Sequence, residues 1–472
     1  MLKVSTLVLI CKDIGFDEFF QEFLFNKVEI CDELKNKIIE SRKIYEREAK
    51  KGNVYGYSTS LGALINKQNV HNREREKIIL REHDTSIGKN VPSLLIKATM
   101  LVRLIQLSKG NSPVRIEVIE RLRDAINNNI IPIVPILGSV GASGDLAPLS
   151  RIFRCLIYGE GFAYYNNEKV SCNDALHNSG LEIFELEPGE ALALINSNAF
   201  STAMSLINTY VIEKIFNLSL DVAKESLYLS GCNNQHYSEA IYETKKQPGV
   251  KTVIEKLNNP CLDTPRLQDP YSIRCIPQIY GALFDTIGFS KEVLKNEMNS
   301  SSDNPIIYSG NVYHACQFHA IYSGIISDFL KTAAIPVMNS VERRISQLLD
   351  GKINRKSDFL LKEKSVVGAM IMQYTAASIS AYSRGSSISM SSHSIPTSGM
   401  QEDVVSMAPN SSLELMKING LFLRLVSIEK AINMFNEEKD LPDPKDLLEK
   451  SYEYLINKGD LNKYSELLNY FF

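Results

Sequence analysis

The segment Gly138-Ser139-Val140-Gly141-Ala142-Ser143-Gly144-Asp145-Leu146-Ala147-Pro148-Leu149 combines three glycines and two serines in front of an apolar stretch. Glycines this close together indicate a turn. A phosphate-binding loop fits poorly, because no Lys-Ser/Thr pair follows the glycines and the spacing is not GxGxxG. A nucleophile elbow requires GxSxG, which is absent. An inert glycine-rich turn is the third alternative.

The composition of the chain is that of an ordinary globular protein. Its 472 residues are 44% hydrophobic and 23% charged, which excludes a disordered or fibrous chain. The formal net charge of −3 gives the protein no general attraction to nucleic acid or to an acidic membrane surface. The early apolar run from Val4 to Cys11 is too short to span a bilayer. We therefore expect no nucleic-acid partner and no membrane segment.

The eight cysteines are scattered and form no CxxC pair. This pattern is typical of reduced thiols in an intracellular protein rather than of a disulfide framework or a zinc site. We expect a cytoplasmic protein without a metal ion.

Two regions of different texture divide the chain. Residues 1–200 are mixed and rich in turns, and residues 201–472 are dominated by long helical patterns. Apolar stripes at helical spacing predict long helices near residues 321–348 and 413–435, with Pro336 as a predicted kink in the first. We predict two domains with a boundary at residue 200.

Two local patterns in the N-terminal region give specific predictions. Ser112 as a cap and Pro113 at the first helical position predict a helix that continues to about Ile126. The apolar run from Ala191 to Ile195 predicts a buried, strand-like segment.

The 138–149 segment resembles the signature of the aromatic amino-acid ammonia-lyase and aminomutase family, which includes histidine, phenylalanine and tyrosine ammonia-lyases. In that family an Ala-Ser-Gly tripeptide cyclises by itself into 4-methylidene-imidazole-5-one, abbreviated MIO. The resemblance implies that Ala142, Ser143 and Gly144 form this ring, and that no external cofactor is needed. The Gly144 nitrogen would attack the Ala142 carbonyl, and loss of water together with the Ser143 hydroxyl would leave an electrophilic methylidene group.

Further segments resemble the family's motifs in the same order along the chain. They are Val54-Tyr55-Gly56 with 58–62 (the tyrosine loop), Leu80–Gly88 with His83, Leu194-Ile195-Asn196, Gln268-Asp269-Pro270-Tyr271-Ser272-Ile273-Arg274-Cys275 with Pro277-Gln278, Ser302-Asp303-Asn304-Pro305, Tyr313-His314-Ala315, and Ile395-Pro396-Thr397-Ser398 with Gln401-Glu402-Asp403.

The resemblance implies a role for each of these motifs in the removal of ammonia. Tyr55 would be the base that takes the β-proton of the substrate, and a tyrosine with a free pKa near 10 needs help to act as phenolate. Arg274 would bind the substrate carboxylate as a bidentate fork. Hydrogen bonds to the carboxylate, the amine or the ring would come from Asn196, Gln268 and Tyr271.

The residues next to the substrate side chain resemble those of histidine ammonia-lyases most. His83 and Glu402 would contact an imidazole, and Glu402 is also counted as a catalytic residue. The pair Glu82-His83 stands where histidine-specific members have Ser-His. Tyr313 would flank the ring pocket in place of the usual phenylalanine.

Conversion of L-histidine to urocanate is therefore the expected reaction. A tyrosine ammonia-lyase, a 2,3-aminomutase and a catalytically inactive relative are the alternatives. The resemblance also implies a mainly α-helical fold, with a mixed N-terminal domain that holds the ring and a long-helix bundle like the fumarase/aspartase core. A homotetramer whose chains share active sites is expected.

The chain departs from the family pattern at three further places. Ser60-Leu61 replaces Gly-Phe in the tyrosine loop, and Ser197-Asn198-Ala199 replaces Gly-Thr-Gln after Asn196. Cys316 stands where a glutamate often follows the FHA motif.

Overall fold

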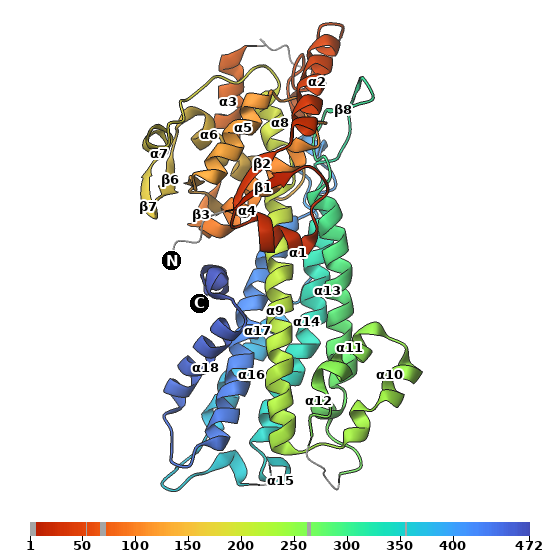
Figure 1. The fold of residues 1–472 in the computed structure, drawn as a ribbon, viewed down its shortest axis with the longest axis vertical. Coiled ribbons are helices and arrows are strands. Elements are labelled where there is room, and N and C mark those ends of the chain that lie inside the picture. The colour runs from red at the N-terminus through yellow and green to blue at the C-terminus, as the bar shows by residue number, and fades with distance from the viewer. Residues whose placement is uncertain (1–5, 53, 67–71, 262–265, 355) are drawn as a thin grey trace. The chain divides into compact units, whose positions relative to one another are not determined.

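The fold is known from a computed structural model that describes residues 6–52, 54–66, 72–261, 266–354 and 356–472. Helices make up 62% of the chain, which confirms the mainly α prediction. The chain forms two compact units (Figure 1). The first unit comprises Met1–Ile207, Lys291–Ile326 and Ser389–Ser412, and the second comprises Asn208–Ser290, Ser327–Ile388 and Leu413–Phe472. The predicted domain boundary at residue 200 stays a prediction.

The first unit consists of short strands and medium-length helices. Its helices are α1 (Phe16–Glu18), α2 (Asp32–Ala49), α3 (Arg73–His83), α4 (Ser93–Ser108), α5 (Ile116–Asn127), α6 (Leu146–Tyr158), α7 (Cys172–Asn178) and α8 (Glu190–Ile195). Its strands are β1 (Leu7–Ile10), β2 (Lys27–Ile30), β3 (Ile87–Asn90), β4 (Ile131–Pro132), β5 (Pro135–Leu137), β6 (Phe162–Tyr165), β7 (Glu168–Ser171), β8 (Ile306–Tyr308) and β9 (Asn311–Tyr313).

The described strands of the first unit pair in small sheets. β1 and β2 are parallel, and β3–β5, β4–β6–β7 and β8–β9 are antiparallel. Helix α4 is buried over nearly its whole length, and its side chains form part of the apolar core of this unit.

Four long helices begin in one unit and continue in the other. They are α9 (Ala199–Ser230), α13 (Ile276–Met298), α14 (Ile321–Leu348) and α17 (Ala408–Glu437). The last two confirm the long helices predicted from apolar stripes, and Pro336 lies inside α14.

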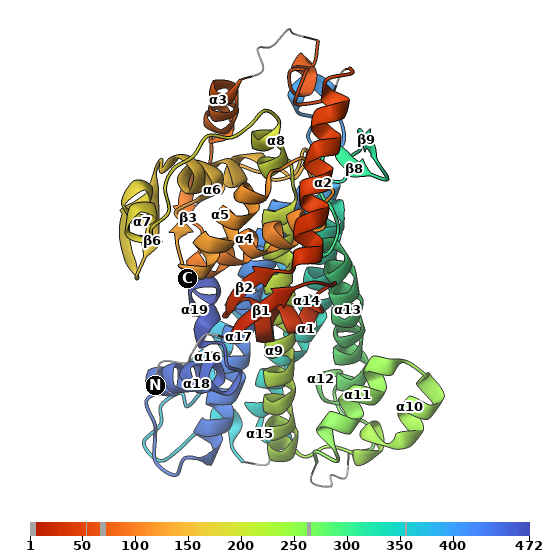
Figure 2. The ribbon, with the colours of Figure 1, turned by 45° about the horizontal axis from the view of Figure 1, so that its top comes forward.

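Parts of these four helices form the bundle of the second unit, where Figures 1 and 2 show them side by side. Shorter helices complete it: α10 (Glu239–Lys245), α11 (Pro248–Leu257), α12 (Tyr271–Arg274), α15 (Gly351–Asn354), α16 (Met370–Gly385), α18 (Pro444–Lys458) and α19 (Ser465–Leu468).

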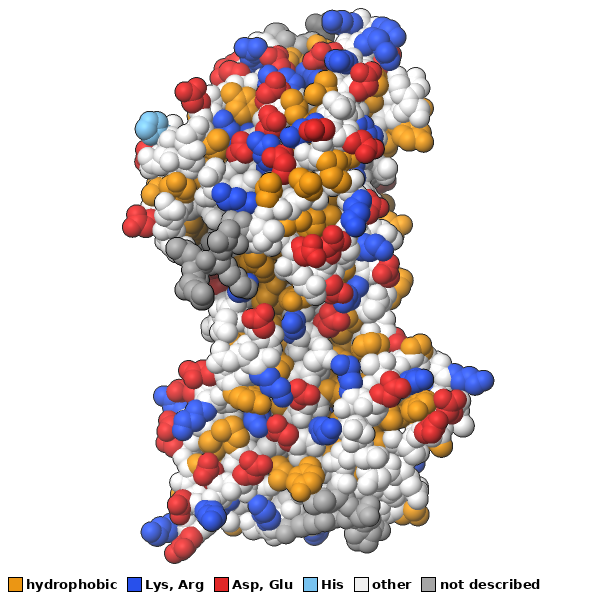
Figure 3. Space-filling model, viewed as in Figure 1, with side chains coloured by type: hydrophobic (Ala, Val, Ile, Leu, Met, Phe, Trp, Pro, Cys, Tyr) orange, Lys and Arg blue, Asp and Glu red, His pale blue; other side chains and the backbone are white. Residues whose placement is uncertain are grey.

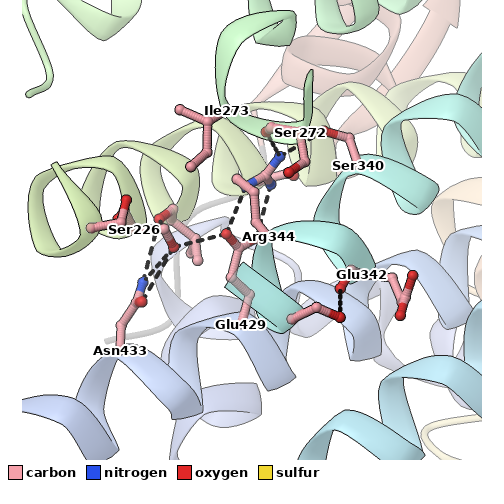
Figure 4. Close-up of polar contacts among 12 residues, drawn as sticks. Ser226, Ser272, Ile273, Ser340, Glu342, Arg344, Glu429 and Asn433 are labelled. Carbon is pink, nitrogen blue, oxygen red and sulfur yellow. Dashed lines mark hydrogen bonds and ion pairs between the residues drawn. The ribbon is translucent and has the colours of Figure 1, made fainter. Parts of the chain in front are cut away.

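A buried ion pair joins the helices of this bundle. Arg344 of α14 binds both carboxylate oxygens of Glu429 on α17, at 2.8 and 2.9 Å (Figure 4). Arg344 also donates to the hydroxyl of Tyr280 on α13 at 2.8 Å, and Glu429 accepts from Ser226 on α9 at 2.8 Å. Because both charges are paired and hydrogen-bonded, their burial is tolerated, and the bidentate geometry fixes how the helices pack.

Two local predictions from the sequence are wrong. Helix α5 begins at Ile116 rather than at Pro113, because the Ser112 hydroxyl binds the Asp303 carboxylate instead of capping the helix. Ala191–Ile195 belongs to helix α8 rather than to a strand, although its burial is confirmed.

The prediction that all cysteines are reduced is also wrong. Cys155 is bonded to Cys172 in the first unit, and Cys232 to Cys261 in the second. Their Cα atoms are 5.3 and 5.2 Å apart, within the range for disulfides. These pairs lie 17 and 29 residues apart in sequence, so the spacing alone does not reveal them.

Charged side chains of both signs are interspersed on the face of the molecule drawn in Figure 3. Within the described ranges, none of the helices combines the length and the apolar character needed to cross a bilayer.

A cluster of ion pairs fastens α3 to α6 in the first unit. Arg81 and Arg154 each approach the Glu160 carboxylate to 2.6 Å, and Arg151 and Arg154 bind the buried Asp84. Burial would raise the pKa of Glu160, but the hydrogen bonds from Arg81 and Arg154 outweigh it and lower the pKa to about 2.

The Glu160→Gln substitution tests this cluster. A lowered pKa contributes stability above the unfolded-state pKa of about 4.3, and that stability is lost as the pH falls towards 2. We expect Glu160→Gln to cost about 1–2 kcal/mol at neutral pH, with a smaller loss as the pH falls below about 4. Thermal unfolding at several pH values measures this. The exposed Glu168→Gln is the control, and an equal loss in both variants would contradict the account.

Candidate active site

The Ala142-Ser143-Gly144 tripeptide lies in a loop between β5 and α6. Gly141 and Gly144 have φ angles of +66° and +75°, which favour glycine. A Cβ atom on Gly144 would lie 2.5 Å from the carbonyl oxygen of Ser197, so the two backbones meet more closely than any side chain allows. The prediction of a glycine-rich turn in this segment is confirmed.

Hydrogen bonds from distant segments hold this loop from both sides. The Asn196 amide donates to the Ser143 carbonyl at 2.7 Å, and the Asp145 N–H donates to the Ser197 carbonyl at 2.7 Å. On the other side, the Ser406 hydroxyl donates to the Gly141 carbonyl at 2.8 Å. The loop is therefore fixed in place by segments that lie far apart in the sequence.

Asp145 joins the end of this loop to the start of α9. Its carboxylate accepts from the N–H and the hydroxyl of Ser201, both at 2.8 Å, and from the Ser139 hydroxyl at 2.7 Å. Burial raises the pKa of Asp145, and these hydrogen bonds act in the opposite direction. The negative carboxylate also lies where the helix dipole favours an anion.

Glu402 faces the tripeptide directly. The Ser143 hydroxyl donates to one oxygen of the Glu402 carboxylate, and the Thr397 hydroxyl donates to the other at 2.5 Å. Thr397 and Glu402 also form an isolated β-bridge, so the backbone holds this carboxylate in a fixed place. Ser143 and Glu402 lie 259 residues apart in the sequence.

Tyr55 is the other functional side chain that the sequence predicts in this region. Its phenolic oxygen accepts a hydrogen bond from the Gly62 N–H at 2.8 Å. Burial raises the pKa of Tyr55, the Gly62 hydrogen bond opposes that rise, and the nearby Glu402 adds to it. The N–H of Gly62 favours phenolate, the form that can act as a base.

Two residues that the sequence reasoning gave no role hold the tyrosine loop. The Tyr55 N–H donates to His314 Nε2 at 3.1 Å, which requires the tautomer with the proton on Nδ1. The buried Arg75 donates to the carbonyls of Gly56 and Thr59, at 2.9 and 2.8 Å. His314 stands inside a recognised motif and could have been predicted, whereas no sequence signal points to Arg75.

A cavity of about 870 Å³ opens in front of the tripeptide. Four of the predicted site residues line it: Tyr55, Ala142, Ser143 and Glu402. The remaining lining residues are both polar and apolar, and include His314, Gln401, Asp403, Phe318 and Val404.

Four other predicted residues of the first unit are not among the lining residues. Gly144 is turned towards Ser197, and Asn196 is buried, with an Oδ1 atom that accepts no hydrogen bond from the described part of the chain. Tyr313 is half-exposed on β9, beside His314. His83 ends α3, and its Nδ1 atom lies 2.7 Å from the Ile79 carbonyl.

The last three predicted residues belong to the second unit. Tyr271 and Arg274 lie on the short helix α12, which begins three residues after Gln268, and Tyr271 is 71% exposed. Arg344 donates to the Ser272 carbonyl of α12 at 3.5 Å (Figure 4).

Known proteins resemble this chain in both sequence and fold. A family model described as aromatic amino acid lyase matches residues 19–436. A probable histidine ammonia-lyase from Thermoplasma volcanium is 33% identical, over 96% of this chain and 96% of its own. A phenylalanine aminomutase from Pantoea agglomerans is 28% identical, with a TM-score of 0.85 over 94% of each chain. A histidine ammonia-lyase from Trypanosoma cruzi shares the fold, with a TM-score of 0.86 at 24% identity over 98% and 96% of the two chains.

Proposed function

Because the chain belongs to the aromatic amino acid lyase family, we propose that it eliminates ammonia from an aromatic L-amino acid, most favourably from L-histidine to give urocanate. The observation that carries this proposal is the Ala142-Ser143-Gly144 loop, which faces Glu402 and lies in the same cavity as Tyr55. The bond to be broken joins nitrogen to Cα, and a proton must leave Cβ.

We propose that the tripeptide forms MIO in the mature protein, and the loop fits that ring. Gly144 lies against the Ser197 backbone where no Cβ could fit, and Asn196 binds the Ser143 carbonyl. Loss of the Ser143 hydroxyl would place the methylidene carbon on the side of Glu402, the acceptor of that hydroxyl. Once formed, the ring supplies an electrophile for the amino group, which makes ammonia a better leaving group.

Tyr55 would take the β-proton, and the Glu402 carboxylate would bind the imidazole or the ammonium group of the substrate. A phenolate stabilised by the Gly62 N–H is a base of suitable strength for a weakly acidic C–H bond. Glu402 offers a carboxylate to an imidazole or an ammonium group, an interaction that is lost on a phenyl side chain. We propose that His83 also contacts the side chain of the substrate, and a histidine beside a carboxylate favours histidine as the substrate.

The carboxylate of the substrate requires a partner of opposite charge. Arg274 is the proposed partner, with Gln268 and Tyr271 as hydrogen-bonding neighbours and Tyr313 beside the ring. We propose a homotetramer in which other chains supply Gln268, Tyr271 and Arg274 to each cavity. We also propose a cytoplasmic location, on the ground of the family and not of the cysteines, because two pairs of them are bonded.

A 2,3-aminomutase is the second candidate, and tyrosine is the second candidate substrate. The 28% identity with a phenylalanine aminomutase supports the mutase as a candidate. A lyase and a mutase both remove the amine from Cα, and they differ only in whether the amine is released or returned to Cβ. The departure at Ser60-Leu61 lies in the loop that carries the base, so it bears on whether ammonia leaves or returns.

A substrate panel on the purified protein tests these proposals. We expect an ultraviolet-absorbing acrylate from L-histidine, with kcat/KM at least about tenfold higher than from L-tyrosine or L-phenylalanine. Glu402→Gln should lower that preference, with Gln401→Glu as a control for charge near the cavity. A β-amino acid found by mass spectrometry would identify a mutase. If none of the amino acids reacts, the inactive alternative replaces the proposal.

A further inference from the structure

A series of hydrogen bonds connects buried side chains of the first unit next to the Ala142-Ser143-Gly144 loop. The Ser197 hydroxyl donates to the Gln106 carbonyl oxygen at 2.7 Å, and the Gln106 amide donates to the Asn198 oxygen at 2.9 Å. The Asn198 amide in turn donates to the Glu297 carboxyl group. Ser197, Asn198 and Gln106 are fully buried. We call this chain of four side chains the relay.

The relay has one direction, which is set at Glu297, where Asn198 donates, and at Gln106, whose oxygen also accepts from the donor-only Arg103 at 3.4 Å. A side-chain amide has one end that donates and one that accepts, so fixing one end fixes the other. Glu297 accepts from Asn198, which turns the Asn198 oxygen towards Gln106 and the Gln106 oxygen towards Ser197. Ser302 contributes a further hydroxyl, 2.9 Å from the Gln106 oxygen.

At its other end the relay reaches the backbone that holds the tripeptide. The Ser197 carbonyl accepts the Asp145 N–H at 2.7 Å, and the same carbonyl lies where a Cβ on Gly144 would clash. The Ser197 hydroxyl also accepts the Ala199 N–H at 3.1 Å, at the start of α9. The Ser197 backbone is therefore the surface against which Gly144 must turn to reach the Ala142 carbonyl, and the Ser197 hydroxyl ties that backbone to Gln106 and to the start of α9.

We propose that Glu297 is a positioning residue for ring formation: through Asn198 and Gln106 it orients Ser197, and Ser197 holds the backbone at Gly144 and Asp145 for cyclisation. This inference rests on the proposed function, because it assigns a partner to the ring that the function requires. It also assigns a positioning role to Ser197-Asn198, the pair that replaces Gly-Thr of the family pattern.

The role requires an acceptor at residue 297 rather than a negative charge. Burial raises the pKa of Glu297 to about 7, while the hydrogen bond from Asn198 lowers it. Both protonation states of the carboxyl group keep an oxygen that accepts from Asn198. Glutamine offers the same acceptor, whereas leucine leaves the Asn198 amide buried and unpaired.

The rate of ring formation in newly made protein tests the proposal. Intact-mass spectrometry of samples taken during cell-free synthesis follows the loss of two waters, about 36 Da, without any measurement of activity. We expect Glu297→Gln to mature within about twofold of the unaltered chain and Glu297→Leu to mature at least about tenfold more slowly. The matched control is Glu292→Leu on the exposed face of the same helix, and it should mature normally.

A double-variant cycle separates the relay from a general loss of structure. Ser197→Ala should slow maturation, and Ser197→Ala combined with Glu297→Leu should be no slower than the slower single variant. The proposal would be overturned if the double variant slowed maturation by the product of the two single effects. It would also be overturned if Glu297→Leu matured at the normal rate. If circular dichroism shows that Glu297→Leu is unfolded, Asn198→Ala replaces it with the same expectations.

The outcomes also separate this inference from the proposed function. An unaltered chain that never loses the two waters contradicts the proposed function. An unaltered chain that matures beside an equally fast Glu297→Leu contradicts the relay alone.

Discussion

Ser143→Ala is expected to lower kcat by more than about 10³-fold while the protein remains folded. Alanine has no hydroxyl to lose, so the methylidene group cannot form, and the substrate amine meets no electrophile. The fold should tolerate the change, because the Ser143 carbonyl keeps its hydrogen bond from Asn196 and Glu402 keeps its bond from Thr397. Steady-state kinetics with the best amino acid of the panel measure the loss, and thermal unfolding confirms the fold.

Ser150→Ala is the matched control for this experiment. Ser150 lies on α6, seven residues beyond Ser143, and its buried hydroxyl has no hydrogen-bond partner within the described ranges. We expect this variant to keep full activity and to be at least as stable as the unaltered chain. Activity of Ser143→Ala close to that of Ser150→Ala would refute the role of Ser143.

Tyr55→Phe is expected to lower kcat/KM by about 10²–10⁴-fold, the usual contribution of a general base. The ring of phenylalanine fills the same space but has no oxygen to accept the β-proton or the Gly62 N–H. Because burial raises the pKa of Tyr55, only a small fraction is phenolate at neutral pH. The rate of the unaltered protein should therefore rise with pH from about 7 to 10.

The pH profile distinguishes a base from a packing residue. In Tyr55→Phe the remaining rate should not show this alkaline rise, whereas Tyr57→Phe, two residues further on, should keep it. A full alkaline rise in Tyr55→Phe would show that another group takes the proton. Substrates deuterated at Cβ add a second measurement, because a larger isotope effect is expected when proton removal becomes slower.

Contiguous motifs could be interpreted from the sequence, because their chemistry depends on neighbouring backbone units. The crowded glycines predicted a turn, and in the structure Gly141 and Gly144 of this turn have positive φ angles. The helix around 321–348 was also predictable, since its apolar stripe repeats over many turns.

Features that depend on distant partners could not be predicted in the same way. Ser112 has the local signature of a helix cap, yet its hydroxyl binds Asp303, 191 residues away. The short apolar run 191–195 fits a strand or a buried helix equally well, and only tertiary packing decides between them. The resemblance assigned Ser143 and Glu402 to one site, but it did not predict the hydrogen bond between them, and 259 residues separate the two in sequence.

The relay to Glu297 shows the same limit within the active-site region. The sequence marks Ser197-Asn198 as a departure from the family pattern, but it does not show where these side chains point. Only the fold brings Gln106 from α4 and Glu297 from α13 to them.

The intact mass of the mature, purified protein tests most directly whether the chain makes its own electrophile. The account predicts a mass about 36 Da below that of the unmodified sequence, with the loss confined to the peptide that contains Ala142-Ser143-Gly144. The Ser143→Ala protein should lack the full two-water loss. A mature protein with the unaltered mass of its sequence would contradict the account.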